Sequence, residues 1–442
     1  MGGPRRARVA ARTPVTPWTG TYALPAAAAP VAIVVRDGTV SLGPGHASSL
    51  PVQVTVDGAH VRFVVPDRVV FDGTIRGRTL RGVVRQGSLR GTFSLRRGVS
   101  RIVELLGIYR SAAGAGVAVA EADGLPPTLL ELPSGAVHGI GASLTVGARL
   151  GDTRGDGAIR VDAHGFVWQG TQYDRFPVRQ QEVRVGVDAA TLTLPPGRGP
   201  FPAVVMVHGS GPRTRDEFDL FTAFFALHGI AVLADDKRGV GESRGAYPGD
   251  AATTAAIDLL ARDAQAEVAF LARRPRIDPR RIGLFGDSQA GWISPLAAVR
   301  DPAIGWLVSN SGPTVSVGET DEWASLAGES EAPPSGTPAA MLAAVRAQGP
   351  SGYDPASTLR RLAIPALWLY GGDDRNVPTE LCVERLTALQ PGHDFTWVVL
   401  PTTHTPLVLP TGLLSSLPQS PGFDPRFFPA LADWLRGHNL TR

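Results

Sequence analysis

The sequence predicts an α/β protein with a doubly wound, mostly parallel sheet, preceded by small antiparallel β domains. Two observations predict this architecture. Short alternating apolar runs broken by turn dipeptides fill the chain from about residue 17 to residue 180. Beyond that point, strand-like apolar runs alternate with segments of helical length, as is typical of parallel sheets with helices on both faces.

The first β-rich stretch, residues 17–100, has the spacing of antiparallel hairpins. Its expected strands are Val31–Val35, Val61–Val65, Val69–Phe71 and Gly91–Leu95, with turns at Asp37-Gly38 and Asp72-Gly73. A stretch of this length suffices for a small barrel or sandwich. Residues 1–16 are expected to form a flexible N-terminal arm.

A second β-rich module is expected over residues 101–180. Candidate strands are Val117–Ala120, Ser143–Val146 and Phe166–Trp168, and glycines at 124, 135, 151 and 155 mark turns. Three roles remain open for the two β modules: covering the mouth of an active site, mediating contact in a homodimer, or stabilising the chain.

Residues 181–442 are expected to form the catalytic domain. Its expected strands are Ala203–Val207, Ile230–Ala234, Ile282–Phe285, Trp306–Val308, Ala366–Tyr370 and Phe395–Leu400, and its clearest helices are Phe218–His228 and Ala251–Arg273. The first of these strands is wholly apolar, as a parallel strand buried on both faces should be. In such sheets the functional residues gather at the carboxyl ends of the strands.

Composition limits the classes of partner. The 442 residues carry a net charge of only +3, which gives no reason to expect a nucleic-acid partner. Eleven arginines between Val61 and Arg110 indicate a solvated outer face, with an anion-facing surface as the alternative. Cys382 is the only cysteine, and we see neither an apolar signal region nor a membrane-length apolar run. We expect a soluble cytoplasmic protein without membrane association.

The strongest motif runs from Arg281 to Trp292 and has the form of a nucleophile elbow. A buried strand leads into Gly286, a sharp turn presents Ser288, and a helix follows directly. Small residues must flank the serine so that strand and helix pack closely, and here they are Gly286, Ala290 and Gly291. The common pattern has glycine two residues after the serine, so Ala290 is a departure that alanine's small size allows.

A serine nucleophile needs a base that is oriented by an acid. In chain order both should follow later strands. Ala366–Tyr370 leads into a loop containing Asp374, and Phe395–Leu400 leads to His404. Asp374 is preferred over Asp373 because the loop Gly371-x-x-Asp374-x-x-Val377-Pro378 has the form of a known acid loop.

Four other histidines are poorer candidates for the base. His208 precedes the nucleophile, and His393 precedes the last strand. His228 and His438 fall within or at the ends of helices.

An oxyanion hole requires main-chain N–H donors near the nucleophile. We expect one from Gln289, at the start of the helix after the elbow, where the helix dipole assists. The second is expected from Ser210, in the glycine-rich loop after the first buried strand.

These motifs resemble a bacterial group of α/β-hydrolases close to the dienelactone hydrolase and prolyl-oligopeptidase-like branches. The likeness covers about residues 183–442 and rests on stretches in the right order: Leu194-Pro-Pro, His208-Gly-Ser-Gly-Pro212, Asp236-Lys-Arg-Gly-Val-Gly-Glu-Ser243, Gly286-Asp-Ser-Gln-Ala-Gly291, Tyr353-Asp-Pro, Tyr370-Gly-Gly-Asp-Asp374 and His404. The resemblance implies a β-rich N-terminal extension and a cap at about residues 311–350. Lys237 is expected to have a packing or salt-bridge role beside the site.

In the expected cap, 341–347 is a short helix at most, which suggests a short or mobile lid over an open pocket. The leading functional hypothesis is hydrolysis of a small-molecule carboxylic ester through an acyl-enzyme, with no cofactor and no metal. Acyl transfer or peptide hydrolysis by the same triad is the alternative. A binding or scaffolding protein that retained the fold is a further hypothesis.

Overall fold

The computed structural model describes residues 18–23, 31–36, 39–42, 50–51, 53–65, 69–86, 89–97, 105–120, 127–141, 143–152, 155, 157–329 and 332–441. The chain divides into two compact units, with the boundary between residues 104 and 105. Within the described residues, no helix is both long enough and apolar enough to cross a membrane.

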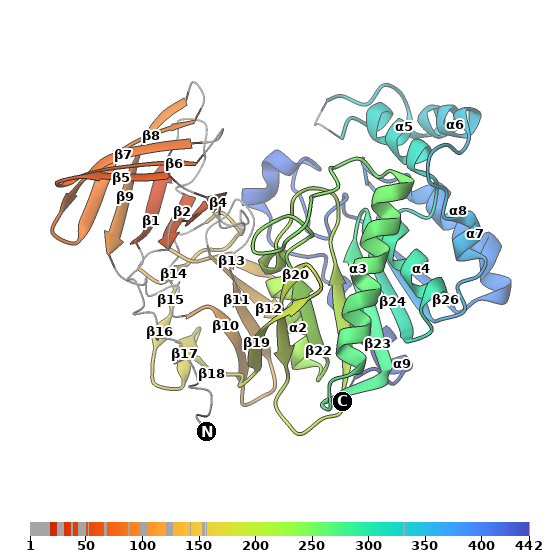
Figure 1. Ribbon diagram of the computed structural model, residues 1–442, viewed down its shortest axis with the longest axis horizontal. Coiled ribbons are helices and arrows are strands. Elements are labelled where there is room, and N and C mark those ends of the chain that lie inside the picture. Colours follow the sequence, from red (N-terminus) through yellow and green to blue (C-terminus); the bar gives the residue numbers. More distant parts are fainter. Residues whose placement is uncertain are drawn as a thin grey trace, which may run out of the picture. The chain divides into compact units, whose positions relative to one another are not determined.

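The first unit is a nine-stranded antiparallel sheet, drawn in red and orange in Figure 1. Its strands are β1 (Trp18–Ala23), β2 (Val31–Arg36), β3 (Thr39–Leu42), β4 (Leu50–Pro51), β5 (Gln53–Asp57), β6 (His60–Val65), β7 (Val69–Arg76), β8 (Thr79–Gln86) and β9 (Leu89–Arg97). They pair in the order β4-β3-β2-β1-β9-β8-β7-β6-β5. No pairing among the described residues joins β4 to β5, so a closed barrel or a sandwich stays a prediction.

The expected turn at Asp72-Gly73 was wrong, because both residues lie inside β7. Gly73 pairs with Gly82 of β8, and a Cβ on Gly73 would lie 2.7 Å from the ring of Phe93. The glycine therefore serves close packing, and the chain turns after Arg76 instead. The other expected turn, Asp37-Gly38, falls outside the described residues.

The second β-rich stretch belongs to the same compact unit as the residues that follow it. Its strands are β10 (Gly107–Ser111), β11 (Gly116–Ala120), β12 (Thr128–Leu132), β13 (Val137–Gly139), β14 (Thr145–Val146), β15 (Gly157–Ala158), β16 (Arg160–Val161), β17 (Gly165–Trp168) and β18 (Thr171–Arg175). All but β14 and β15 form one sheet, in the order β13-β12-β11-β10-β18-β17-β16. We call these strands, β10 to β18, and the segments that connect them the second β module.

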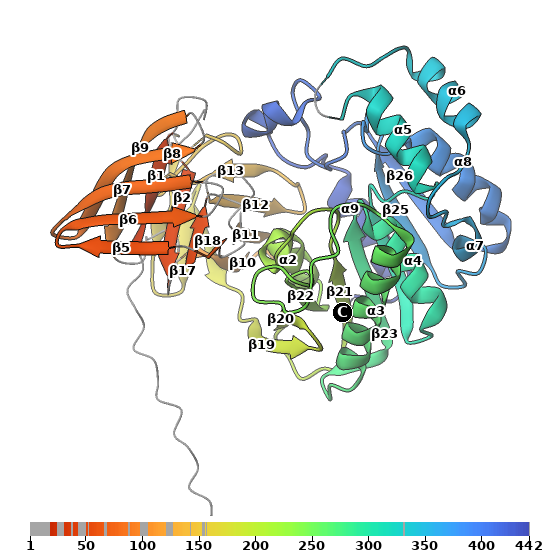
Figure 2. The same cartoon turned by 45° about the horizontal axis from the view of Figure 1, so that its top comes forward.

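The second β module packs on the part of the chain that follows it. Ile108, Ala118 and Leu130 share one buried cluster with Phe224 and Phe225 of helix α2 (Asp219–Leu227). Figure 2 shows β11 and β12 beside α2. The sequence boundary expected near residue 180 therefore does not separate two compact units, because these side chains form a common core.

The main sheet has eight strands in the order β19-β20-β22-β21-β23-β24-β25-β26. They are β19 (Arg179–Val185), β20 (Asp188–Leu194), β21 (Phe201–Val207), β22 (Ala231–Asp235), β23 (Ile277–Asp287), β24 (Ile304–Asn310), β25 (Ala366–Gly371) and β26 (Phe395–Leu400). β20 pairs antiparallel with β19 and β22, and the pairs from β22 to β26 are parallel. The six expected strands are confirmed. β19 was not predicted because polar residues interrupt the apolar pattern of 179–185, and β20 was not predicted either.

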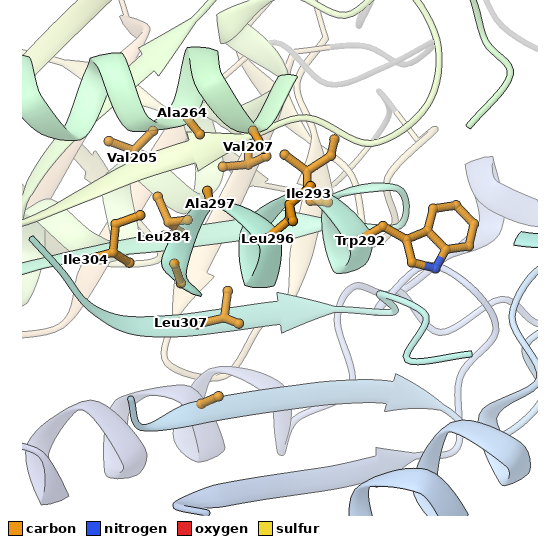
Figure 3. Packing of buried hydrophobic residues seen from close by; sticks show 14 of the residues in the cluster. Val205, Val207, Ala264, Leu284, Trp292, Ile293, Leu296, Ala297, Ile304 and Leu307 are labelled. Carbon is orange, nitrogen blue, oxygen red and sulfur yellow. The ribbon is translucent and has the colours of Figure 1, made fainter. Parts of the chain in front are cut away.

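Helices cover both faces of this sheet (Figure 1). Besides α2 they are α3 (Thr254–Ala272), α4 (Ala290–Arg300), α5 (Val317–Ala327), α6 (Pro338–Gln348), α7 (Ala356–Leu359), α8 (Thr379–Leu389) and α9 (Phe427–Gly437), with short 3₁₀ turns η1 (Arg215–Phe218), η2 (Gln390–Gly392) and η3 (Leu414–Gln419). Alternate residues of β21 enter two different cores. Val205 and Val207 pack with α3 and α4 (Figure 3), whereas Val204 and Met206 pack with α2 and α9. Burial on both faces explains why this strand is wholly apolar.

The cap region holds two eleven-residue helices, so the expectation of one short helix at most was wrong. Ser316 caps the start of α5, and Glu319 hydrogen-bonds back to the main-chain N–H of Ser316. This Ser-x-x-Glu capping box is visible in the sequence and could have identified α5.

Candidate functional site

Ser288 lies in the sharp turn between β23 and α4. Its φ of 50° is in the left-handed region, which non-glycine residues rarely adopt. The turn is held by hydrogen bonds from Ser288 N to Asn310 O and from Gly291 N to Ser288 O, at 3.0 and 2.8 Å. The strained turn presents the serine side chain at the carboxyl end of a central strand.

The small residues around Ser288 are required by close contacts. A Cβ on Gly286 would lie 2.6 Å from Val207 O, and one on Gly291 would lie 2.5 Å from the main chain of Gly312. Ala290 is fully buried against Gly286. Alanine at this place therefore fits the elbow.

His404 and Asp374 are hydrogen-bonded, with Nδ1 of the imidazole 2.8 Å from Oδ2 of the carboxylate. The Asp374 side chain is fully buried, and its other oxygen accepts hydrogen bonds from the main-chain N–H groups of Asn376 and Val377. Burial disfavours the imidazolium, but the charge and hydrogen bond of Asp374 outweigh it and raise the pKa of His404. The pair is arranged to hold one tautomer of the histidine.

The alternatives to this pair have structural partners. His208 is buried, and its Nε2 lies 2.7 Å from the main-chain oxygen of Asp235. His228, His393 and His438 each hydrogen-bond through Nδ1 to a carbonyl four residues earlier. Asp373 is exposed, and its main-chain N–H bonds to Thr402 O.

Ser288 and His404 line one cavity of about 1260 Å³, which also contains Asp287, Gln289 and Ser210. The structure thus brings together the carboxyl ends of β21, β23 and β26. Burial, together with the charge of Glu217, raises the pKa of Asp287 to about 6. The described residues include no cluster of His, Cys, Asp or Glu side chains that could hold a metal ion.

The two expected oxyanion donors flank the elbow. Gly209, next to Ser210, approaches so closely that a Cβ on it would lie 3.3 Å from the Cβ of Ser288. Among the described residues, neither the main-chain N–H of Ser210 nor that of Gln289 has a hydrogen-bond acceptor. Both groups are therefore available to a ligand.

Two contacts at the site were not predicted from the sequence. Trp323 of α5 donates from its indole N–H to Asp374 O at 2.9 Å, which ties the cap to the acid loop. Lys237 extends its ammonium into the loops around the oxyanion donors, where it is 2% exposed. No sequence signal distinguished Lys237 from a lysine with a packing role, since its partners come from distant parts of the chain.

Comparisons with known proteins show similarity to hydrolases. Residues 199–333 match the Hydrolase_4 family, described as serine aminopeptidase, S33. The esterase EstD of Thermotoga maritima is 29% identical over 228 residues, which cover 45% of this chain and 52% of that protein. The esterase FrsA of an Enterobacter species is 35% identical over 74 residues, covering 16% and 18% of the two chains. This chain spans about half or less of the length of these two relatives.

The similarity to solved structures is low. Esterase Pf2001 of Pyrococcus furiosus has a TM-score of 0.43 at 17% identity, covering 59% of this chain and 91% of that one. A dienelactone hydrolase of Anabaena variabilis has a TM-score of 0.36 at 18% identity, covering 59% and 98%.

Proposed function

We propose that this member of the α/β-hydrolase family is a serine hydrolase that cleaves carboxylic esters, with Ser288 as nucleophile, His404 as base and Asp374 as the supporting acid. The observation that carries the proposal is the 2.8 Å bond between His404 and the buried Asp374, in the cavity that Ser288 also lines. A serine at a strained strand-to-helix turn is positioned for attack when such a base faces it.

The proposed reaction has two halves. His404 takes the proton of the Ser288 hydroxyl through Nε2 while Oγ attacks the ester carbonyl carbon, and the N–H groups of Ser210 and Gln289 hold the resulting oxyanion. The C–O bond to the alcohol then breaks, and His404 returns the proton to the departing alcohol oxygen. His404 then takes a proton from water, which attacks the acyl carbon. The bond from that carbon to Ser288 Oγ breaks, the acid is released, and His404 returns the proton to Oγ. Throughout, Asp374 keeps the proton on Nδ1 and stabilises the imidazolium.

Ester hydrolysis by single-residue variants tests the proposal. The wild type should hydrolyse p-nitrophenyl acetate, and Ser288→Ala should lose about 10⁴-fold or more in kcat. Ser357→Ala is the matched control, since Ser357 lies exposed on α7 and outside the cavity. Equal activity in Ser288→Ala and the wild type would overturn the assignment of the nucleophile.

Peptide hydrolysis is the second candidate. It is favoured by the description of the matched family and by Asp321 and Glu329, two of the carboxylates that line the cavity. These acids could attract the ammonium group of a peptide N-terminus. Amino-acid p-nitroanilides distinguish the candidates: turnover of anilides faster than esters would favour the peptidase. Acyl transfer is tested by adding a competing alcohol, and a scaffold protein would hydrolyse neither substrate. A cytoplasmic location and a homodimer stay predictions.

A further inference from the structure

The cavity around Ser288 is lined by polar side chains from several segments, including Arg213, Glu217 and Asp250, and by apolar side chains. The cap and the acid loop add the polar side chains Asp321, Glu329, Arg375 and Asn376. Some of these groups are already paired, since Asn376 donates to the carboxylate of Glu329 at 2.9 Å.

We call the apolar lining residues of three separate segments the apolar wall: the second β module, α2 and the residues that follow His404. One buried cluster joins members of all three: Val137, Leu150, Phe221, Leu407, Leu417 and Phe423.

The apolar wall includes residues of the second β module. Val137 and Leu150 are buried, at 0% and 2% exposure, and both line the cavity. Phe221 of α2 adds an aromatic ring to the same wall. The module is thus part of the site although it lies outside the main sheet.

The third segment follows His404 directly and is rich in leucine. We define it as residues 405–423, and its cavity-lining leucines are Leu407, Leu409, Leu413, Leu414 and Leu417. Leu414 is 57% exposed, and it is one of few large apolar side chains exposed to this degree in the described residues. Clustered apolar side chains open to a cavity are typical of a site for an apolar ligand.

Main-chain hydrogen bonds tie the second β module to this leucine-rich segment. Val137 N donates to Pro421 O, Leu150 N to Ser420 O and Gly151 N to Pro418 O, at 3.0, 3.0 and 2.7 Å. In the reverse direction, Phe423 N donates to Gly135 O at 2.9 Å. The module therefore holds the segment in place in addition to lining the cavity.

We infer that the second β module and the leucine-rich segment form a binding site for the apolar chain of the substrate. The preferred substrates are esters that carry a medium-length alkyl chain. The chain lies along this wall while the ester carbonyl faces Ser288. This inference rests on the proposed esterase function, and it gives the second β module a role in substrate specificity.

Two ester series test the inference and show which side of the ester carries the chain. In the acyl series, kcat/KM of the wild type should rise from p-nitrophenyl acetate to the octanoate. Each buried methylene contributes up to about fourfold, so a total rise of at least about tenfold is expected. The alcohol series compares ethyl and octyl acetates. A rise confined to one series identifies the acyl or the alcohol side.

Leu413→Asn and Leu414→Asn should reduce the ratio of kcat/KM for the octanoate to kcat/KM for the acetate at least about fivefold. Both side chains lie outside the buried clusters, so these variants should fold. Val161→Asn is the matched control, because Val161 is 50% exposed and does not line this cavity. A wild type that hydrolyses acetate with no chain preference in either series would overturn the inference alone. Equal losses on acetate and octanoate in the leucine variants would also overturn it. No hydrolysis of any ester would instead overturn the proposed function.

A separate observation concerns Lys237, the only lysine in the sequence. Its Nζ donates to Gly209 O at 2.7 Å, to Gly211 O at 3.3 Å and to the side-chain oxygen of Gln289 at 3.0 Å. An ammonium has three protons, and three acceptors surround this one. Burial lowers the pKa of Lys237 to about 8.

The three acceptors belong to the two segments that supply the oxyanion donors. Gly209 and Gly211 stand on either side of Ser210, and Gln289 follows the nucleophile. We propose that Lys237 is a positioning residue, which fixes the N–H groups of Ser210 and Gln289 relative to each other. This inference also rests on the proposed function, but it does not depend on the substrate chain.

Lys237→Met tests this role because it keeps the length of the side chain and removes all three bonds. We expect kcat for p-nitrophenyl acetate to fall about 100-fold, with KM changed less than about threefold. Affinity for an aryl trifluoromethyl ketone, which forms an oxyanion on Ser288, should fall by a similar factor. A purely structural role would lower the unfolding temperature without this split between kcat and KM.

If Lys237→Met does not fold, Gln289→Leu removes one of the three bonds and keeps the main-chain N–H of residue 289. Its kcat should fall about tenfold. Retention of wild-type kcat in a folded Lys237→Met, or in Gln289→Leu, would overturn the positioning role. An inactive wild type would count against the proposed function instead.

Discussion

The methyl group of Ala290 occupies the space beside Gly286: a Cβ on Gly286 would lie 2.4 Å from the Cβ of Ala290. Real Cβ atoms do not approach this closely, so only one of the two positions can carry a side chain. The elbow therefore tolerates alanine two residues after the serine because glycine stands two residues before it.

The first prediction concerns this pair. Gly286→Ala should abolish ester hydrolysis or folding, because the added methyl also meets Val207 O at 2.6 Å. Ala290→Gly should keep kcat within about threefold and cost about 1 kcal/mol of stability. Kinetics with p-nitrophenyl acetate and thermal unfolding provide both measurements. An active, stable Gly286→Ala enzyme would contradict the packing argument.

The second prediction concerns the acid. Asp374→Asn should lower kcat about 10³- to 10⁴-fold, because the carboxylate no longer holds His404 in the productive tautomer. Asp373→Asn is the matched control and should stay near wild type, since Asp373 is exposed. The reverse result would identify Asp373 as the acid.

The third prediction concerns pH. His404, the proposed base, can accept a proton only when neutral, and Asp374 raises its pKa against the effect of burial. Activity should therefore be full above the pKa of His404 and fall as the pH drops through it, with a midpoint above about 6.5. In Asp374→Asn the midpoint of the residual activity should move to lower pH. A pH midpoint of wild-type activity at or below the pKa of a free imidazole would contradict the proposed role of this pair.

The fourth prediction concerns stability beside the site. Arg215 donates to both carboxylate oxygens of the buried Asp236, each at 2.9 Å. Burial disfavours the charged carboxylate, but the bonds from Arg215 and neighbouring N–H groups lower the pKa of Asp236. Arg215→Met leaves that charge unpaired and should cost about 3 kcal/mol of unfolding free energy.

Because the pKa of Asp236 is lowered in the folded state, its contribution to stability is present above the unfolded pKa. The difference in unfolding free energy between Arg215→Met and the wild type should shrink as the pH falls below the pKa of a free aspartic acid. Denaturant unfolding at neutral and acid pH measures both effects. Arg262→Met, an exposed arginine of α3, is the control and should leave stability almost unchanged. A similar loss in both variants would contradict this account of Arg215.

The α/β-hydrolase fold could be predicted because its signals are local. Wholly apolar strands such as 203–207 and the turn around Ser288 depend on neighbouring residues. β19, at one edge of the sheet, was missed because it begins with four consecutive polar residues, 179–182, and so lacks an apolar run. Gly73 was misinterpreted because the sequence alone does not distinguish a glycine required for close packing from one required for a turn.

The site was predictable to the extent that chain order constrains it. The elbow and the loop before His404 follow strands whose carboxyl ends must meet at one edge. Lys237 could not be assigned in this way, because Gly209 and Gln289 lie 28 and 52 residues from it. The sequence also does not reveal the apolar wall. Leu150 and Leu413 line the same cavity only because the second β module packs against the segment that follows His404.

The most direct measurement is mapping the covalent adduct of a fluorophosphonate by mass spectrometry of the digested protein. The proposed mechanism predicts one adduct per chain, on Ser288, and no adduct when His404→Ala is treated under the same conditions. An adduct on another serine, or labelling of Ser288 that does not depend on His404, would contradict it.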